Sequence, residues 1–263
     1  MKAVISTTYD DQYLFFLPIV TFLWNKLGVD VICFMPEGSV NSKPKQISLI
    51  GKVIKGMGVS LHGFTCHEHK EATYAQCSRL YAACLDLPED EILVVSDIDM
   101  GVFSLPPQEN GGFVIYGADL VPPKQYPMCY ISATAGEWRR VFELNGKHYQ
   151  DCLDKLLGDI ECENMRGNYW GKDQEESYLR ISQNRKTLIN RALPETQFAT
   201  KRVDRDDAFW RDRITPDLVD AHLWRPGYTD ENFANILELI ETMYPNEDLT
   251  WMVNYQQQYK NLL

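Results

Sequence analysis

Two aspartates one residue apart follow a short apolar run, and they are the first side chains in this sequence whose spacing suggests chemistry. The run from Ile92 to Val95 is short and β-branched, as in a strand buried on both faces. Asp97 and Asp99 should therefore lie at the carboxyl end of that strand, the edge of an open α/β sheet where ligands bind. Two carboxylates this close repel each other, and a divalent cation such as Mg²⁺ or Mn²⁺ relieves the repulsion while leaving positions for substrate phosphates. The alternative is a strand end with two solvated aspartates in a turn.

The composition limits the functions open to the chain. It has 263 residues, of which 44% are hydrophobic and 24% charged, and these values are typical of a globular protein with a sizeable core. The net charge of −11 argues against nucleic-acid binding through a broad basic surface. An acidic protein that binds a diphosphate needs a metal ion or a few local cations, which agrees with a metal at Asp97 and Asp99.

The cysteines and the longest apolar stretch bear on location. Seven scattered cysteines without a C-x-x-C pair favour reduced thiols and a cytoplasmic protein. Residues 66–69 (Cys-His-Glu-His) look metal-like, but no second cysteine pair stands at zinc-finger spacing, so we expect no zinc site. The apolar stretch from Leu14 to Trp24 is too short to span a bilayer and follows two aspartates, so we expect a core helix rather than a transmembrane segment or signal peptide.

Apolar strands alternate with helical patterns over the first hundred residues. Strands are expected at 3–7, 29–35, 59–64 and 92–95, and helices at 12–27, 45–57 and 72–85. Further strands are expected at 113–116 and 128–133, and helices at 135–144, 149–157, 175–181, 230–243 (with Thr229 as its cap) and 251–262. The stretch 184–217 is charged and irregular. This alternation predicts an α/β fold with a mainly parallel central sheet flanked by helices, in a single domain because no linker interrupts it.

This order of elements, with Asp-x-Asp after the fourth strand, resembles the GT-A glycosyltransferases over nearly the whole chain. Asp97-Ile98-Asp99 matches the metal-binding Asp-x-Asp of that family. Gly-Lys-Asp173-Gln174 looks like the Asp-Gln segment at the start of a helix in glycogenin-like and galactosyltransferase-like (family 8-type) members. His222, in His-Leu-Trp-Arg-Pro-Gly, looks like the late histidine that completes their metal site.

The resemblance implies a metal-dependent transfer of a sugar from a nucleotide-diphosphate sugar to a hydroxyl group on a glycan or other acceptor. The donor expected from the resemblance is a UDP-sugar. Asp97, Asp99 and His222 would hold the metal, and the imidazole favours Mn²⁺ over Mg²⁺. The metal would act as a Lewis acid for the departing diphosphate. Within one GT-A-like domain, 1–100 would be the nucleotide-binding half, 101–228 the acceptor and catalytic half, and 229–263 the C-terminal helices.

Five further residues would contact the donor in a protein of this family. Thr7, Thr8 and Tyr9 end the first strand, where the family binds its nucleotide base, although a plain β–α turn is the alternative. Arg79, in the helix before the Asp-x-Asp strand, would reach the donor sugar or phosphates, or would lie on the surface of an amphipathic helix. Arg225 would neutralise diphosphate charge, or is a surface arginine.

Asp173 and Gln174 are the candidates for catalysis. In an inverting enzyme Asp173 would take the proton of the acceptor hydroxyl. In a retaining enzyme the corresponding acid binds sugar hydroxyls, and Gln174 would lie near the anomeric carbon. The Asp-Gln pair leans towards the retaining group, but Lys172 replaces the small or acidic residue that often precedes it, so the stereochemistry stays open. Trp170 and Tyr169 would stack on an acceptor sugar, or simply pack.

Three other classes compete with this interpretation. A haloacid-dehalogenase-like phosphohydrolase would use Asp97 as nucleophile and Asp99 as acid. Its motif normally follows the first strand, however, and Gly101 replaces the threonine expected there. A non-catalytic nucleotide-sugar-binding module would not need Asp173. A nucleotidyltransferase would need a glycine-rich basic loop after the first strand, which we do not find.

Overall fold

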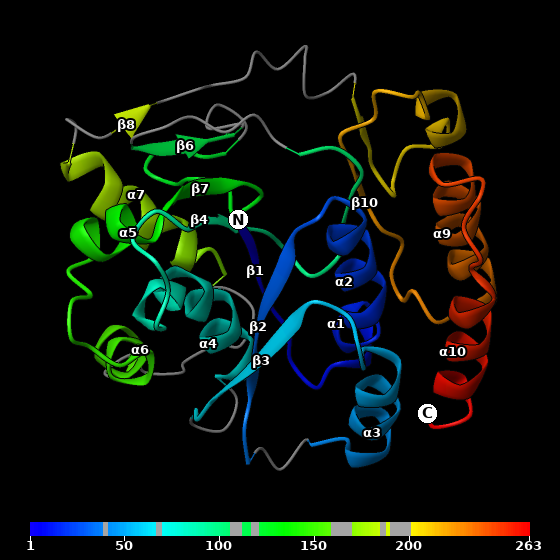
Figure 1. Cartoon of the computed structure of the whole chain (residues 1–263), viewed down its shortest axis with the longest axis horizontal. Coiled ribbons are helices and arrows are strands. Elements are labelled where there is room, and N and C mark those ends of the chain that lie inside the picture. Colours follow the sequence, from blue (N-terminus) through cyan, green and yellow to red (C-terminus); the bar gives the residue numbers. More distant parts are fainter. Residues whose placement is uncertain are drawn as a thin grey trace.

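A central β-sheet divides the molecule into two helical layers (Figure 1). The structure is a computed structural model, and it describes residues 1–38, 42–66, 70–105, 112–116, 121–158, 170–184, 188–189 and 201–263. Within these ranges the sheet has seven strands: β1 (Lys2–Ser6), β2 (Asp30–Pro36), β3 (Val59–Phe64), β4 (Ile92–Val95), β6 (Phe113–Ile115), β7 (Ile131–Thr134) and β8 (Leu188–Ile189). They lie in the order β3-β2-β1-β4-β7-β6-β8.

Most neighbours in this sheet are parallel. The strands β3, β2, β1 and β4 run parallel to one another, as does β8 to β6, whereas β7 is antiparallel to both β4 and β6. The predicted α/β class, with a mainly parallel sheet flanked by helices, is confirmed. The expected strand 128–133 begins later, at Ile131.

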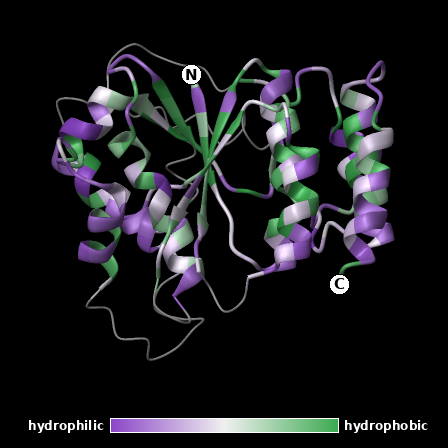
Figure 2. Cartoon of the chain, turned by 60° about the horizontal axis from the view of Figure 1, so that its bottom comes forward, coloured by the Kyte–Doolittle hydropathy of each residue, from purple (hydrophilic) through white to green (hydrophobic). Residues whose placement is uncertain are grey.

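Helices cover both faces of the sheet (Figures 1 and 2). One face carries α1 (Asp11–Leu14), α2 (Leu17–Lys26) and α3 (Pro44–Val53), with α9 (Asp230–Met243) and α10 (Thr250–Lys260) outside them. The other face carries α4 (Glu71–Ser78), the 3-10 helix η1 (Arg79–Cys84), α5 (Ala135–Val141), α6 (Tyr149–Leu157) and α7 (Lys172–Gln183). Strand side chains alternate between the two cores, so that Ala3 and Ile5 pack on the first and Val4 on the second.

A second, smaller sheet was not predicted. It consists of β5 (Met100–Val102), β9 (Arg202–Val203) and β10 (Asp220–His222), in the order β5-β10-β9. Strands of two or three residues are too short to show an alternating hydrophobic pattern, which explains why the sequence did not reveal them. This sheet brings residue 222 next to the Asp-x-Asp segment.

Three helix predictions differ from the structure in detail. The helix expected at 12–27 is interrupted between α1 and α2, because Pro18 has no N–H to continue the first helix and stands in the first turn of the second. The helix expected at 72–85 becomes a 3-10 helix after Ser78, whose hydroxyl donates to the Ala75 carbonyl and competes with the α-helical pattern. Thr229 occupies the cap position of α9, but its hydroxyl donates to the Pro226 carbonyl instead of capping the helix.

The connections create a crevice between β1 and β4. The chain leaves β1 through α1 and α2 on one face and enters β4 from η1 on the other, and β1 and β4 are neighbours. In open α/β sheets such a switch point opens a ligand site at the carboxyl ends of the two strands.

Two sequence expectations concern features outside the site. Among the described residues, no helix combines the length and apolarity needed to cross a bilayer. The six described cysteines are all free thiols, whereas Cys162 lies outside the described residues. Three of the four residues of the Cys-His-Glu-His stretch also lie outside the described ranges.

Candidate functional site

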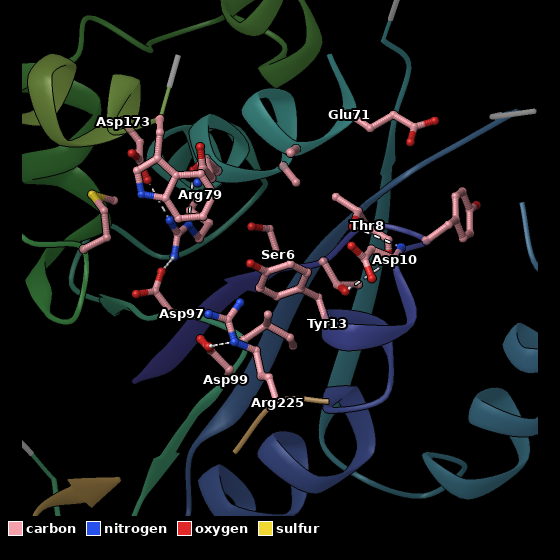
Figure 3. A pocket seen from close by; sticks show the side chains of 18 of the residues that line it. Ser6, Thr8, Asp10, Tyr13, Glu71, Arg79, Asp97, Asp99, Asp173 and Arg225 are labelled. Carbon is pink, nitrogen blue, oxygen red and sulfur yellow. Dashed lines mark hydrogen bonds and ion pairs between the residues drawn. The ribbon is translucent and has the colours of Figure 1, made fainter. Parts of the chain in front are cut away.

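A cavity of about 740 Å³ lies at the carboxyl ends of β1 and β4 (Figure 3). All ten residues that the sequence nominated for donor, metal or catalytic roles line it: Thr7, Thr8, Tyr9, Arg79, Asp97, Asp99, Asp173, Gln174, His222 and Arg225. They come from five segments of the chain, so the fold brings together side chains up to 218 positions apart (225 minus 7). Their roles stay predictions, whereas their shared location is a feature of the structure.

Arg79 lies between two carboxylates, and we call Arg79, Asp97 and Asp173 the anionic cluster. One terminal nitrogen of the guanidinium binds Asp97 Oδ1 and the backbone oxygen of Ser96, and the other lies 2.7 Å from Asp173 Oδ2. The side chains of Arg79 and Asp173 are 4% and 2% exposed, whereas that of Asp97 is 34% exposed. The alternative of a surface arginine is therefore wrong for Arg79, which is buried in the wall of the cavity. Two carboxylates against one guanidinium leave this cluster with a formal charge of −1.

The two carboxyl groups of the anionic cluster differ in pKa. Burial raises the pKa of Asp173, and the charge of Arg79 does not fully offset it. For Asp97 burial also acts to raise the pKa, but the charge and hydrogen bond of Arg79 outweigh it, with help from the Cys129 thiol, and the pKa lies below its ordinary value. A pair of acids whose environments move their pKa values apart is common in catalytic sites.

Helix α7 places Asp173 and Gln174 in its first turn. It begins after Gly171, whose φ of +91° is a left-handed conformation that favours glycine over residues with a Cβ. Asp173 Oδ1 also accepts from the Gln174 backbone N–H at 2.9 Å, so both of its oxygens are engaged. The helix starts three residues earlier than the predicted 175, and it therefore includes the catalytic candidates. Trp170 just before it is 68% exposed and lines the cavity, whereas Tyr169 lies outside the described residues.

Asp99 binds two guanidinium groups, and we call Asp99, Arg205 and Arg225 the cationic cluster. Arg205 donates to Asp99 Oδ2 at 2.9 Å, and Arg225 Nε lies 3.2 Å from the same oxygen. The guanidinium of Arg225 also lies over the Tyr13 ring, 4.8 Å from its centroid, a cation–π distance. Figure 3 shows Arg225 and Tyr13 facing the cavity. Arg225 is thus an ion-paired cavity residue rather than an isolated surface arginine, and the cluster has a formal charge of +1.

The small sheet positions His222 beside Asp99. His222 in β10 is paired with Met100 in β5, directly after the Asp-x-Asp segment. At the other end of β10, the guanidinium of Arg202 makes two hydrogen bonds of 2.7 Å to the Asp220 carboxylate, and the Tyr130 hydroxyl donates to it at 2.8 Å. These buried contacts fix the strand, and they leave His222 Nε2 3.7 Å from Asp99 Oδ2.

The predicted metal ligands do not form a metal site as their side chains lie. Asp97 is bound to Arg79, and Asp99 to Arg205 and Arg225. The second terminal nitrogen of Arg205 is 3.3 Å from His222 Nε2, so this guanidinium fills the space between the imidazole and Asp99 that a shared cation would need. Within the described ranges, no three His, Cys, Asp or Glu side chains are grouped closely enough to hold a metal ion. Asp97, Asp99 and His222 therefore do not fit the metal in this arrangement.

The residues at the end of β1 form another part of the cavity wall. The Tyr9 hydroxyl donates to the Pro36 carbonyl at 2.6 Å, and its side chain is buried, so Tyr9 anchors the β1–α1 turn. Thr7 is also buried, and Thr8 is partly exposed. Asp10 caps α1 by accepting from the Gln12 N–H at 2.9 Å. The segment therefore combines the two interpretations drawn from the sequence. Tyr9 stabilises a β–α turn, and Thr8 forms a polar part of the cavity wall.

Two cavity residues that the sequence analysis did not nominate are Arg205 and Tyr13. Arg205 lies in the charged stretch 184–217, which has no periodicity and no motif that would single out one arginine. Tyr13 lies in a helical segment whose pattern indicates only packing. The only indication of Arg205 in the sequence was indirect. Two neighbouring acids at a buried strand end require a positive charge, and an arginine can supply it as well as a metal ion can.

Comparison with solved structures shows the same fold in a galactosyltransferase of distant sequence. The galactosyltransferase LgtC, crystallised in complex with donor and acceptor sugar analogues, has a TM-score of 0.50 and 11% identity over 96% of this chain and 99% of its own. An active-site mutant of LgtC gives the same values. The glycosyltransferase GlyE of Streptococcus pneumoniae has a TM-score of 0.49 and 12% identity over 99% of this chain and 64% of its own. No protein-family model and no curated protein sequence matches the chain. The likeness to LgtC confirms the GT-A fold expected from the order of elements.

Proposed function

We propose that this protein is a glycosyltransferase that moves a sugar from a nucleotide-diphosphate sugar to a hydroxyl acceptor. The observation that carries the proposal is the convergence of ten nominated residues on one cavity at the β1–β4 switch point. The LgtC structure, which shares the fold, is a complex with donor and acceptor sugar analogues, and this supports the same class of reaction.

The charges of the cavity suit sugar transfer. When the bond between a sugar and its diphosphate breaks, positive charge develops at the anomeric carbon and negative charge on the diphosphate. The anionic cluster, with Asp97 and Asp173 around Arg79, would stabilise the positive centre. Arg225 in the cationic cluster would neutralise the phosphates. Opposite charges in two neighbouring parts of the cavity wall thus match the charge separation of the transition state.

Asp173 and Gln174 would lie beside the transferred sugar. Arg79 and the Gln174 N–H hold the Asp173 carboxylate in place, and each of its oxygens retains a lone pair for one more hydrogen bond. A carboxylate fixed in this way is better suited to holding a sugar hydroxyl than to moving as a base. This favours the role that the acid has in retaining members of the resembled family, with the Gln174 amide near the anomeric carbon.

The donor that we propose is a UDP-sugar. Thr7 and Thr8 at the end of β1 are placed to contact its base, and Tyr9 supports the turn that carries them. The exposed indole of Trp170 at the rim offers a surface on which an acceptor sugar would stack. A cytoplasmic location stays a prediction from the sequence. So does metal dependence, which the ion-paired side chains of Asp97 and Asp99 do not support.

The phosphohydrolase alternative is not favoured. It requires Asp97 as a nucleophile, but Asp97 Oδ1 is held by Arg79, and the residue follows the fourth strand along the chain. A non-catalytic nucleotide-sugar-binding module would also use the cavity, and it differs from a transferase in having no use for Asp173.

Calorimetric titration of UDP tests the proposal. It would be run with Mn²⁺ and again with a chelator, because the two arms separate nucleotide binding from metal dependence. We expect UDP to bind in at least one arm, and one or more UDP-sugars to be hydrolysed slowly and transferred when a glycan acceptor is added. Absence of UDP binding in both arms, together with release of phosphate from small phosphate esters, would reject the transferase in favour of the phosphohydrolase.

A further inference from the structure

The most informative contact in the cavity is the one between Asp99 and two arginines. Arg205 and Arg225 bind the same oxygen of one carboxylate, so one of the two positive charges remains uncompensated within the cluster. The carboxylate of Asp204 lies 3.5 Å from the far nitrogen of the His222 ring, but it is half-exposed and does not line the cavity. The surplus charge therefore faces the cavity rather than a second buried acid.

The arginines also have hydrogen-bond donors to spare. Arg225 is bound to Asp99 through Nε, and its two terminal nitrogens form no hydrogen bond with the described residues. The Arg225 guanidinium is kept in place by Asp99 on one side and the Tyr13 ring on another. Arg205 is anchored by Asp99 and by the Leu223 carbonyl, to which it donates at 3.1 Å. The side chains of Arg205 and Arg225 are 17% and 24% exposed, so both are accessible and largely shielded from water.

We propose that Arg205 and Arg225 form the diphosphate-binding subsite and supply there the positive charge that the family resemblance assigns to a metal ion. A pair of planar, permanently charged guanidinium groups binds phosphate oxygens through two parallel hydrogen bonds each. Asp99 acts as a positioning residue, since it holds the two guanidinium groups side by side before the ligand arrives. The inference deepens the proposed function, and it rests on that function only for the identity of the nucleotide.

The arrangement around Arg205 is the reason for this assignment. Its guanidinium contacts Asp99 and lies 3.3 Å from His222 Nε2, which are two of the three groups that would have to share a metal. A cation is thus already built into the position where the motif predicts one. In chemical terms, the Asp-x-Asp motif is used here to bind arginine.

The test measures binding of inorganic pyrophosphate and of UDP by calorimetry, in the presence of EDTA. The wild-type protein should bind both ligands without metal. Arg205→Gln and Arg225→Gln should each weaken binding roughly 10- to 100-fold, because each removes charge-assisted hydrogen bonds. Arg205→Lys keeps the charge but loses the two parallel N–H donors of the guanidinium group, so its affinity should lie between those of wild type and Arg205→Gln. Arg211→Gln is the matched control, because Arg211 is ion-paired at 2.7 Å with Glu238 outside the cavity, and its binding should be unchanged.

Asp99→Asn separates the two uses of the motif. If Asp99 positions arginines, this variant should still bind pyrophosphate in EDTA, because the side-chain oxygen of Asn can accept from the same guanidinium groups and a negative charge beside the ligand is removed. If Asp99 is a metal ligand, wild type should bind UDP only when Mn²⁺ is added, and Asp99→Asn should lose that binding. The second pattern would overturn the inference, as would undiminished pyrophosphate affinity in a folded Arg205→Gln variant.

The outcomes also distinguish this inference from the proposed function. Loss of pyrophosphate binding in Arg205→Gln, with no transfer of sugar from any UDP-sugar by wild type, would support the subsite and reject the transferase. Sugar transfer by wild type, with unchanged affinities in both arginine variants, would support the transferase and reject the subsite. Thermal unfolding of every variant shows whether a loss of binding reflects a loss of fold.

Discussion

The arginines of the anionic and the cationic cluster line the same cavity but differ in burial. In the first, Arg79 and Asp173 are almost completely buried, and each charged group has a partner at a fixed distance. In the second, Arg205 and Arg225 retain about a fifth of their surface, and the terminal nitrogens of Arg225 have no hydrogen-bond partner among the described residues. Separating a buried ion pair costs much free energy, whereas a partly exposed charge can take up a new partner at a lower cost. The comparison indicates that the first cluster is a permanent part of the wall and the second a place where an anion is exchanged.

The largest effect is expected from removing the central cation of the anionic cluster. Arg79→Ala leaves the buried carboxylate of Asp173 without its partner, and breaking a buried ion pair in this way costs about 3–5 kcal/mol. Urea unfolding followed by circular dichroism measures the loss. Arg140→Ala is the control, since Arg140 is exposed and, among the described residues, is ion-paired with Glu137 one turn away and with no other acid. Its cost should be below about 0.5 kcal/mol. Equal stabilities for the two variants would show that the anionic cluster is not structural.

Asp173 should matter more for transfer than for donor binding. We expect Asp173→Asn to lower kcat at least about 100-fold by removing negative charge next to the reacting carbon, while the Kd for UDP hardly changes. Glu176→Gln is the control on the same helix, because Glu176 is also a buried acid but pairs with Arg180 and does not line the cavity. Full turnover by Asp173→Asn would reject its proposed role in transfer.

Tyr13 tests whether the cationic cluster is organised for binding. Tyr13→Ala removes the ring over which Arg225 lies, and losing a cation–π contact of this kind should weaken UDP binding roughly two- to fivefold. Tyr13→Phe keeps the ring and should bind as the wild type does. A Tyr13→Phe variant as weak as Tyr13→Ala would show instead that the hydroxyl contacts the ligand.

The smallest effect concerns acid stability. The pKa of Asp97 is lower in the folded than in the unfolded protein, so its ionised form contributes stability above the unfolded pKa, and this is lost as the pH falls through the folded pKa. We therefore expect the difference in free energy of unfolding between wild type and Asp97→Asn to narrow as the pH is lowered from 6 to about 3. The effect is small because Asp97 is one-third exposed and screened by solvent. Unfolding curves at several pH values measure it, and Asp90→Asn, an exposed acid, is the control. If the difference in free energy of unfolding between wild type and Asp97→Asn stayed constant with pH, the pKa of Asp97 would not be lowered by folding.

Much of the fold followed from local patterns in the chain. The run from Ile92 to Val95 is too apolar and too β-branched to lie anywhere except inside a sheet, and the two aspartates after it had to lie at the sheet's edge. Alternation of strands and helices over the first hundred residues was sufficient for the parallel arrangement of β1 to β4. Five of the ten nominated site residues, Thr7, Thr8, Tyr9, Asp97 and Asp99, reach the cavity because the carboxyl ends of the parallel strands β1 and β4 share an edge, a rule that needs no knowledge of packing.

The partners of the acids were decided by tertiary structure alone. Asp97 and Arg79 are 18 residues apart, Asp99 and Arg205 are 106 apart, and no local pattern couples positions at such separations. The sequence required only that two neighbouring carboxylates obtain a positive charge, and it left open whether a metal ion or arginines would provide it. The small sheet decides this in the structure. Strand β10 pairs with β5 and β9 pairs with β10, and together these pairings bring His222 and Arg205 to the end of the Asp-x-Asp segment. The local sequence determines that a positive charge is needed beside the two aspartates. Which group supplies that charge depends on the distant elements that the fold brings near.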